Sequence, residues 1–241
     1  MMMIKSLGSV FLMILSFALL AAPASASATN EYCGPVKAKT AVIVIHGGGF
    51  VIGDNSLTSD TCQAMAAKGF RVINLSYPLG DLIGAEQALY KATVEARKTS
   101  KKVYSYGESA GAGLAALAAA RSWTDGAYAW APVSDLVAWK KETEAAGFLD
   151  WRYFKDSSPT TLVRLSAVNW ASKKSSPALV VHGRDDTIVS YQESVRLKKR
   201  WPKMRLATVK GGHTIYEPSF INATKNAINC FLGKSCSWAK G

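Results

Sequence analysis

Short apolar runs separated by polar segments recur along the chain and predict alternating strands and helices. Six of these runs are bounded by turn residues and lie at 40–46, 70–77, 103–107, 127–132, 177–183 and 204–209. Their length and their content of β-branched and aromatic residues favour strands. Several are apolar on both faces, which is typical of strands in a parallel sheet covered by helices.

Helical periodicity fills several of the segments between these runs. In residues 84–98 one helical stripe is apolar, and Glu86, Lys91 and Glu95 are expected on the opposite, solvated face. The apolar stripe comprises Ala85, Ala88, Leu89, Ala92 and Ala96. Similar patterns occur at 190–201 and 218–232, and an alanine-rich run at 109–122 also predicts a helix. Strands that alternate with helices predict an α/β fold with a doubly wound, mainly parallel sheet of about six strands.

One long segment interrupts the alternation of strands and helices. No convincing strand pattern occurs between about 139 and 176, and the segment is rich in aromatic residues. These are Trp139, Phe148, Trp151, Tyr153, Phe154 and Trp170. A connection of this length usually carries its own helices. We therefore expect a small helical insert, whose rings either form a lid or binding wall, or pack the extra helices onto the body of the domain.

The first 28 residues have the pattern of a secretory signal peptide. Lys5 precedes an apolar run over 7–22, and Ala-x-Ala steps follow at 24–28. The alternative, a membrane anchor, is disfavoured because the apolar run is shorter than the ~20 residues that span a bilayer. We expect cleavage near Ser27 or Thr29, a single domain over 29–241, and a secreted or periplasmic protein.

The cysteines fit an oxidising compartment. The chain has four, Cys33, Cys62, Cys230 and Cys236, and their spacing does not suggest a metal site. Two disulfides are expected in an exported chain, although the sequence leaves three pairings open. The favoured pairing joins Cys33 to Cys62, which ties the start of the mature chain to an early helix, and Cys230 to Cys236, which closes a loop after the last helix.

The composition is basic, with 29 Lys and Arg against 17 Asp and Glu and a net charge of +12. The positive residues are scattered in short groups without a nucleic-acid-binding motif, so we expect a solvated surface and no nucleic-acid partner. The charge fits a weak association with an anionic cell envelope. The oligomeric state is left open.

The stretch Gly-Glu-Ser-Ala-Gly at 107–111 carries the clearest chemical signal. It follows a predicted strand and opens a predicted helix. In that context the two glycines allow a turn too tight for larger residues, which pushes Ser109 out at the carboxyl end of the sheet. Ser109 is therefore the candidate nucleophile.

A second glycine-rich stretch, His-Gly-Gly-Gly-Phe at 46–50, follows the first predicted strand. Its glycines leave backbone N–H groups free to point at a ligand. The amides of Gly48, Gly49 and Ala110 are the candidates for an oxyanion hole, which would stabilise the negative charge of a tetrahedral intermediate. The alternative is a flexible glycine turn.

With these motifs, nearly the whole mature chain resembles the α/β-hydrolases. It is most similar to the esterases and lipases with a His-Gly-Gly-Gly loop that are related to hormone-sensitive lipase, and the stretch VVHGRDDTIV at 180–189 is similar to prolyl oligopeptidases and depolymerases. The chain departs from the family in three respects, one of which is that the expected disulfides are not a general family trait. The two leading strands and the N-terminal cap are not recognisable, and YPLGD at 77–81 stands where the related esterases carry Tyr-Arg-Leu-Ala-Pro.

The resemblance implies a catalytic triad in the chain order serine, acid, histidine. The family pattern His-Gly-x-x-Asp-x-x-Val places the acid at Asp186; Asp185 is a weaker candidate and Asp135 a distant one. His213 is the candidate base because it alone of the three histidines follows the acid. His46 and His182 are expected to be buried structural residues.

These residues predict a serine hydrolase that needs no metal or organic cofactor. Our first hypothesis is a secreted carboxylesterase that works through an acyl-enzyme and acts on a small or polymeric ester. A serine peptidase or a polyester depolymerase would use the same triad. A non-catalytic exported binding protein is the alternative from a different class, since fold alone does not prove activity.

Overall fold

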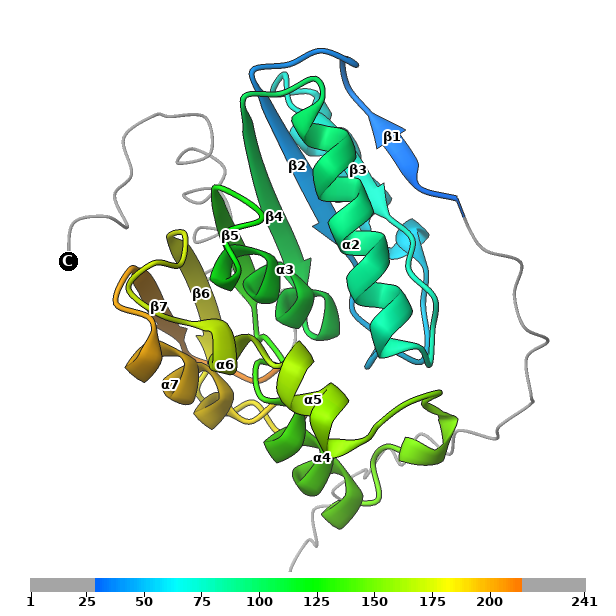
Figure 1. Ribbon diagram of the computed structural model, residues 1–241. Helices are drawn as coiled ribbons and strands as arrows, with labels where there is room; N and C mark the ends of the chain where they lie inside the picture. Colours follow the sequence, from blue (N-terminus) through cyan, green and yellow to red (C-terminus); the bar gives the residue numbers. More distant parts are fainter. Residues whose placement is uncertain (1–28, 214–241) are drawn as a thin grey trace, which may run out of the picture.

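A mainly parallel sheet forms the centre of the protein. The computed structural model describes residues 29–213, which are shown as a ribbon in Figure 1. Within these residues the sheet has seven strands in the order β1-β3-β2-β4-β5-β6-β7, all parallel except β1. The strands are β1 (Glu31–Cys33), β2 (Thr40–Ile45), β3 (Arg71–Leu75), β4 (Lys102–Glu108), β5 (Gly126–Trp130), β6 (Ala178–Gly183) and β7 (Met204–Val209). This architecture is the α/β-hydrolase fold, and all six predicted strands are confirmed.

Helices connect the strands, as the periodicity predicts. They are η1 (Asn55–Thr58), α1 (Ser59–Ala66), α2 (Leu82–Arg97), α3 (Ala110–Ala120), α4 (Leu136–Ala145), η2 (Trp151–Tyr153), α5 (Pro159–Leu165), α6 (Ala167–Trp170) and α7 (Tyr191–Arg200). Side chains cap several of them: Asp81 accepts a hydrogen bond from the Gly84 N–H at the start of α2, and Ser190 accepts one from Gln192 at the start of α7. The helix predicted at 218–232 lies outside the described residues.

The edge strand β1 is the element that the sequence pattern missed. It pairs antiparallel with β3, so one leading strand does precede β2, where the sequence indicated none. Asn74 of β3 is fully buried and donates a hydrogen bond to Glu31 of β1 at 2.7 Å. A disulfide joins Cys33 to Cys62 of α1, as predicted. The predicted pair Cys230 and Cys236 lies outside the described residues.

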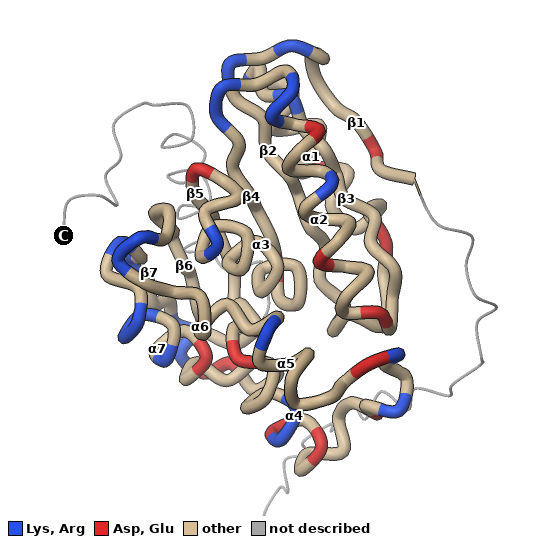
Figure 2. Tube along the Cα trace, viewed as in Figure 1, with Lys and Arg blue, Asp and Glu red and all other residues tan. Residues whose placement is uncertain are grey.

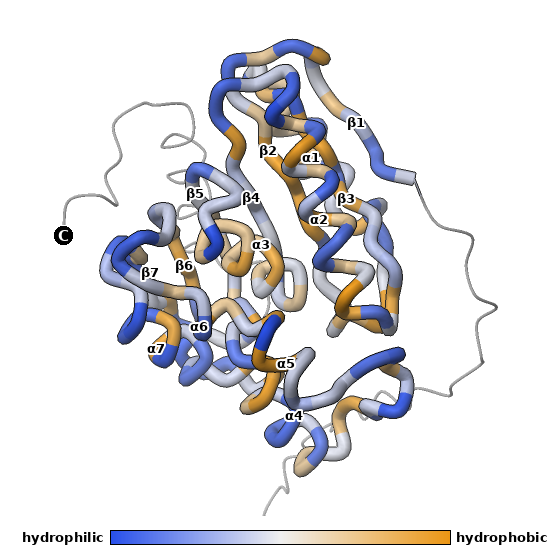
Figure 3. Tube along the Cα trace, viewed as in Figure 1, coloured by the Kyte–Doolittle hydropathy of each residue, from blue (hydrophilic) through white to orange (hydrophobic). Residues whose placement is uncertain are grey.

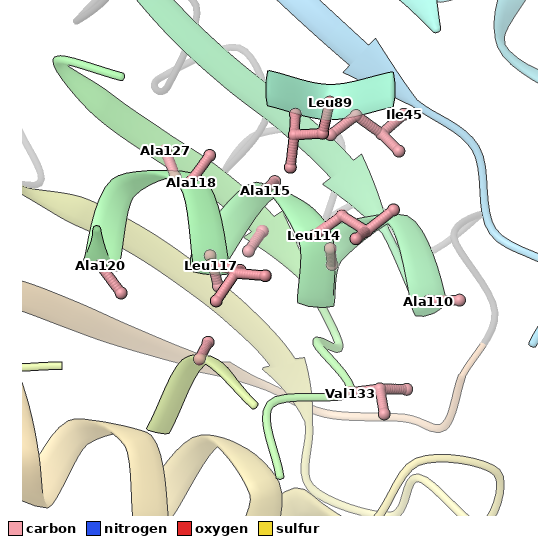
Figure 4. Close-up of a cluster of buried hydrophobic side chains, with 14 of the residues drawn as sticks. Ile45, Leu89, Ala110, Leu114, Ala115, Leu117, Ala118, Ala120, Ala127 and Val133 are labelled. Carbon is pink, nitrogen blue, oxygen red and sulfur yellow. The ribbon is translucent and has the colours of Figure 1, made fainter. Parts of the chain in front are cut away.

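The core lies on both faces of the sheet, where alternate residues of each strand point to opposite sides. Ile43 and Ile45 face the helices α2 and α3, whereas Val42 and Val44 face α1. Figure 3 shows the hydrophobic strands at the centre of the molecule. Figure 4 shows α3 packed against its neighbours through small residues. A side chain on Gly113 of α3 would meet the carbonyl oxygen of Val133 at 2.3 Å, so this helix approaches the chain after β5 as closely as its backbone allows.

Glu86 is buried, so the prediction that it lies on the solvated face of α2 is wrong. The residue is only 5% exposed, and its carboxylate forms ion pairs with Arg121, which follows α3, and with Arg164 of α5 at 2.7 Å. A buried carboxylate is tolerated when opposite charges and hydrogen bonds satisfy it. The pair of arginines therefore turns a position that periodicity assigns to solvent into a buried contact between three helices.

The segment between β5 and β6 contains α4, η2, α5 and α6, and Figure 1 shows the first three at one end of the sheet. Its aromatic residues divide into two groups. Trp139, Trp151 and Phe154 are buried and packed ring against ring. Phe148, Tyr153 and Trp170 are exposed. The first group packs the insert onto the body. The second lies at the surface, where Arg121 stacks on the ring of Trp170.

The described surface is polar and positively charged in places. Lys and Arg residues gather in the loops before β2 and β4, at the amino ends of the strands (Figure 2). None of the helices in residues 29–213 has both the length and the apolar character to span a bilayer.

The disulfide gives a testable prediction about stability. It closes a loop with a sequence separation of 29 residues. Replacing both Cys33 and Cys62 by alanine is expected to lower the free energy of unfolding by about 3–4 kcal/mol, because the unfolded chain regains the freedom of that loop. Urea denaturation of the oxidised wild type and of the double variant measures the difference. Under reducing conditions the wild type should lose most of its advantage; an advantage that persists would contradict the prediction.

Candidate active site

The nucleophile candidate Ser109 lies on a strained turn between β4 and α3. Its backbone has φ 54° and ψ −118°, a conformation that L-residues rarely adopt. The glycines on either side explain why the turn can form. A Cβ on Gly107 would lie 2.2 Å from the carbonyl oxygen of Gly111, and a Cβ on Gly111 would lie 2.3 Å from the carbonyl oxygens of Ile45 and His46. The sequence Gly-x-Ser-x-Gly is therefore a packing requirement of this turn.

Gly111→Ala tests that requirement. The new methyl group would clash with backbone carbonyls of the β2 end, which cannot move aside as a flexible side chain can. We expect the free energy of unfolding to fall by about 3 kcal/mol, at the upper end of overpacking costs. Gly147→Ala is the matched control, because a Cβ there meets nothing within 4 Å and only its φ of +62° is unfavourable. Equal melting temperatures for the two variants would refute the packing argument.

The structure brings Ser109, His213 and Asp186 together from three distant segments. His213 Nε2 lies 3.0 Å from Ser109 Oγ, and His213 Nδ1 lies 2.7 Å from Asp186 Oδ2. Since a carboxylate only accepts, Nδ1 carries a proton and Nε2 is free to accept the hydroxyl proton of Ser109. This is the hydrogen-bond order that a serine nucleophile, a general base and an orienting acid require.

Asp186 is held as a carboxylate by its surroundings. Burial by itself would raise its pKa, but hydrogen bonds from His182 and His213 outweigh that effect and hold the pKa well below its usual range. The backbone N–H groups of Ile188 and Val189 also donate to its Oδ1, both at 2.9 Å. The carboxylate is therefore ionised at neutral pH and fixed in direction.

The two alternative acids lie elsewhere. The side chain of Asp185 is exposed, on the turn that separates β6 from Asp186. Asp135 caps α4 by accepting a hydrogen bond from the Ala138 N–H at 3.2 Å, and it lies 3.7 Å from Arg196. Of the three aspartates considered, Asp186 is the one that contacts His213.

The loops that carry Asp186 and His213 are joined through their backbones. The N–H of Arg184 donates to the carbonyl of Val209, and the N–H of Asp185 donates to the carbonyl of Gly211, both at 3.0 Å. Gly183 lies so close to the second loop that a Cβ would meet the carbonyl oxygen of Gly212 at 2.3 Å. The acid and the base therefore keep their relative position through main-chain contacts.

The glycine loop after β2 passes directly beside Ser109. A Cβ on Gly47 would lie 3.3 Å from the Cβ of Ser109. Gly48 and Gly49 have φ of +106° and +62°, and a Cβ on Gly48 would lie 2.0 Å from the carbonyl oxygen of Ile52. Within residues 29–213, the N–H groups of Gly48, Gly49 and Ala110 donate no hydrogen bond. These amides are available to an anion at this edge of the sheet.

Buried side chains hold the start of this loop. The ring of Tyr77 stacks on His46 with 4.3 Å between centroids, and its hydroxyl donates to the carbonyls of His46 and Gly47. His46 Nδ1 lies 2.7 Å from the Gly47 carbonyl oxygen, so this nitrogen carries a proton. Burial lowers the pKa of His46 and raises that of Tyr77, which keeps both neutral. His46 and His182 are both buried, as the sequence predicted.

Backbone contacts also connect the loop to the insert. The N–H of Gly80 donates to the Phe50 carbonyl, and the Gly80 carbonyl accepts from the N–H of Lys155, each at 2.7 Å. This role of the YPLGD stretch could not be predicted from the residue types, because the contacts use backbone atoms. They anchor the segment that follows the candidate oxyanion loop.

Candidate metal ligands gather at one place among residues 29–213. The one cluster of candidate ligands in this range consists of Glu31, Cys33 and Cys62. Both cysteines are in the disulfide, so neither offers a thiolate to an ion.

Fold and site together define a serine hydrolase of the α/β-hydrolase fold. Residues 74–236 match the prolyl oligopeptidase family, and the chain belongs to that family. The matched range runs from the end of β3 across Ser109, Asp186 and His213. The finer resemblance to the relatives of hormone-sensitive lipase stays a prediction.

Individual proteins match this chain either over a short stretch or at low sequence identity. A proline iminopeptidase of Xylella fastidiosa (strain Temecula1) is 39% identical over 57 residues, which cover 23% of this chain but only 18% of that protein. Among solved structures, the esterase Est2 of Thermogutta terrifontis has a TM-score of 0.69 and 18% identity, over 87% of this chain and 89% of its own. A truncated carbohydrate esterase from gut microbiota has a TM-score of 0.65 and 18% identity, over 82% and 87% of the two chains. At these identities the structural matches show a shared fold.

Proposed function

We propose that this protein hydrolyses carboxylic esters through an acyl-enzyme intermediate. The observation that carries the proposal is the continuous chain of hydrogen bonds from Ser109 through His213 to Asp186, beside a loop whose glycine amides donate no hydrogen bond to any residue of the described range. In the proposed reaction the Ser109 oxygen attacks the acyl carbon while its proton passes to His213 Nε2. The amides of Gly48, Gly49 and Ala110 stabilise the negative oxygen of the tetrahedral intermediate.

The second half of the reaction uses the same groups. His213 returns the proton to the leaving alkoxide, which departs as an alcohol and leaves the acyl group on Ser109. Water then attacks the acyl carbon while His213 takes its proton. As the second intermediate collapses, His213 returns that proton to the Ser109 oxygen and the acid is released. Asp186 stays ionised throughout and stabilises the imidazolium form of His213.

The surroundings of the loop support an uncharged acyl group. A Cβ on Gly49 would lie 3.9 Å from Trp139 Cη2 and from a Val51 methyl group, and the neighbouring Ile52 is 53% exposed. Apolar side chains beside an oxyanion site favour an alkyl or aryl acyl substituent, because its burial releases water from apolar surface. Two structural neighbours, the Thermogutta terrifontis and gut-microbiota proteins, are esterases.

A peptidase is the second candidate, because the chain belongs to the prolyl oligopeptidase family and shares a short stretch with a proline iminopeptidase. The same triad would attack an amide, with His213 protonating the leaving amine. A polyester depolymerase is a variant of the first proposal with a polymeric substrate.

A comparison of two substrate types separates these proposals. The assay measures kcat/KM of the mature chain for p-nitrophenyl acetate and butyrate and for L-prolyl and other aminoacyl p-nitroanilides, with Ser109→Ala as the background. We expect ester hydrolysis well above that background and anilide hydrolysis at it. Because p-nitrophenyl esters are activated, methyl butyrate followed by acid release is the confirming substrate. Turnover of an anilide in preference to methyl butyrate would replace the esterase proposal with the peptidase.

We also propose that the protein is exported and that its basic surface favours weak association with anionic envelope material. The disulfide between Cys33 and Cys62 supports export, since such bonds persist in oxidising compartments. The N-terminal sequence of the protein recovered from the producing cell is the test. A start near Ser27 or Thr29 is expected, and a start at Met1 would contradict cleavage.

A further inference from the structure

A second histidine, besides His213, contacts the proposed catalytic acid. His182 is the penultimate residue of β6, and its side chain is fully buried. Its Nε2 lies 3.2 Å from Asp186 Oδ2 and 2.9 Å from the carbonyl oxygen of Val189. Its Nδ1 lies 2.6 Å from the hydroxyl of Ser194 in α7. Each ring nitrogen therefore has a partner.

These contacts define where the proton of His182 lies. The Val189 carbonyl and the Asp186 carboxylate can only accept, so Nε2 carries the proton and shares it between them. In the neutral ring Nδ1 then accepts from the Ser194 hydroxyl, which can rotate to donate. The two acceptors at Nε2 therefore set the tautomer of His182, and the Ser194 hydroxyl stabilises this tautomer by donating to Nδ1.

We propose that His182 is a positioning residue of the catalytic site, and that Ser194 supports it. The inference rests on the proposed function of Ser109, His213 and Asp186. With His182 and Ser194 included, the chain of hydrogen bonds runs from Ser109 to α7. The carboxylate of Asp186 is then held by β6 and α7 as well as by its own loop.

The carboxylate of Asp186 shows why such a residue matters. Oδ1 accepts from the N–H groups of Ile188 and Val189, while Oδ2 accepts from both His213 and His182. The side chain has no exposure to solvent, so water cannot replace a lost donor. Without His182 the carboxylate loses one of the two donors that fix the direction of Oδ2, and the hydrogen bond that orients His213 is no longer held in place.

A pair of substitutions separates this role from simple packing. In His182→Gln the side-chain amide nitrogen reaches about as far as Nε2 and can still donate to Asp186. In His182→Asn the amide reaches only as far as Nδ1, so it can contact Ser194 but not Asp186. For the Asn variant we expect kcat for p-nitrophenyl butyrate to fall about 10- to 100-fold, the usual effect of losing a hydrogen bond to a charged group. Its KM should stay within about twofold, and the Gln variant should recover most of kcat.

Thermal unfolding shows whether the His182 variants fold. If they do not, two substitutions of Ser194 provide a second matched pair of variants. Ser194→Ala removes the donor to Nδ1, whereas Ser194→Thr keeps a hydroxyl at the same position. We expect a smaller fall in kcat for the alanine variant and near wild-type kcat for the threonine variant. Equal kcat within each folded pair would overturn the proposal.

One readout does not depend on catalysis. The proton between His213 Nδ1 and Asp186 gives a downfield imidazole resonance in a proton NMR spectrum, and ¹⁵N labelling of histidine assigns it. We expect this resonance to move upfield or exchange away in His182→Asn and to persist in His182→Gln. An unchanged resonance in the Asn variant would refute the positioning role. If the wild type hydrolysed neither esters nor anilides, the proposed function would fail, and the NMR comparison would still decide whether His182 holds Asp186.

Discussion

Ser109→Ala is expected to lower kcat for ester hydrolysis by about 10⁴- to 10⁶-fold, because the variant lacks the atom that forms the acyl-enzyme. The substitution should lower kcat and leave KM nearly unchanged, since the glycine loop and the apolar side chains beside it are unchanged. The free energy of unfolding should change little, because within residues 29–213 the hydroxyl contacts only the partly exposed His213, whose Nε2 lies 3.0 Å away.

Labelling with a fluorophosphonate probe gives the direct measurement. The wild type should be labelled at Ser109 and the alanine variant should not, as mass spectrometry of the labelled peptide would show. Ser122→Ala is the matched control: this exposed serine lies just beyond the other end of α3, and its loss should leave labelling and kcat unchanged. Labelling of the Ser109→Ala protein at the wild-type rate would remove Ser109 as the nucleophile.

Asp186→Asn is expected to lower kcat by about 10⁴-fold. The side-chain amide of asparagine can donate to His213 Nδ1, which favours the tautomer whose proton sits on Nε2. That tautomer cannot accept the proton of Ser109. Asp185→Asn removes an equal charge one position earlier, from an exposed side chain, and should retain nearly full activity. The reverse order of the two activities would assign the acid to Asp185.

The same substitution has a consequence for stability as a function of pH. The pKa of Asp186 is lower in the folded protein than in the unfolded chain, where it is about 3.9. A group with a depressed folded pKa contributes stability above its unfolded pKa and loses that contribution as the pH falls towards the folded value. The free energy of unfolding of the wild type should therefore fall relative to Asp186→Asn as the pH drops below about 4. Denaturation curves at pH 3, 4, 5 and 7 test the sign, and a constant difference would contradict it.

Much of the fold can be predicted from local sequence patterns alone. The strands of a covered parallel sheet must be apolar on both faces, so β2 and β6 appear as apolar runs. β1 does not, because it has three residues, of which only Cys33 is buried. Such a strand exists because β3 supplies its hydrogen bonds and a disulfide anchors it.

The burial of polar groups could not be predicted in the same way. Glu86 has a polar position on α2 by periodicity, and the two arginines that neutralise it come from 35 and 78 residues later in the chain. Asn74 similarly becomes fully buried because Glu31 and Thr58 satisfy its amide. The free energy of burying such groups depends on partners that only the folded chain brings together.

The sequence by itself determined the kind of chemistry: a serine between close-packed glycines, a loop of bare amides, and an acid and a histidine in the right chain order. The family pattern favoured Asp186 over the adjacent Asp185, but only the tertiary structure shows that the side chain of Asp186 contacts His213 while that of Asp185 is exposed. It also decided that His182 contacts Asp186. Local patterns fix the conformation of a turn, but the direction of a side chain depends on the distant elements that pack around it.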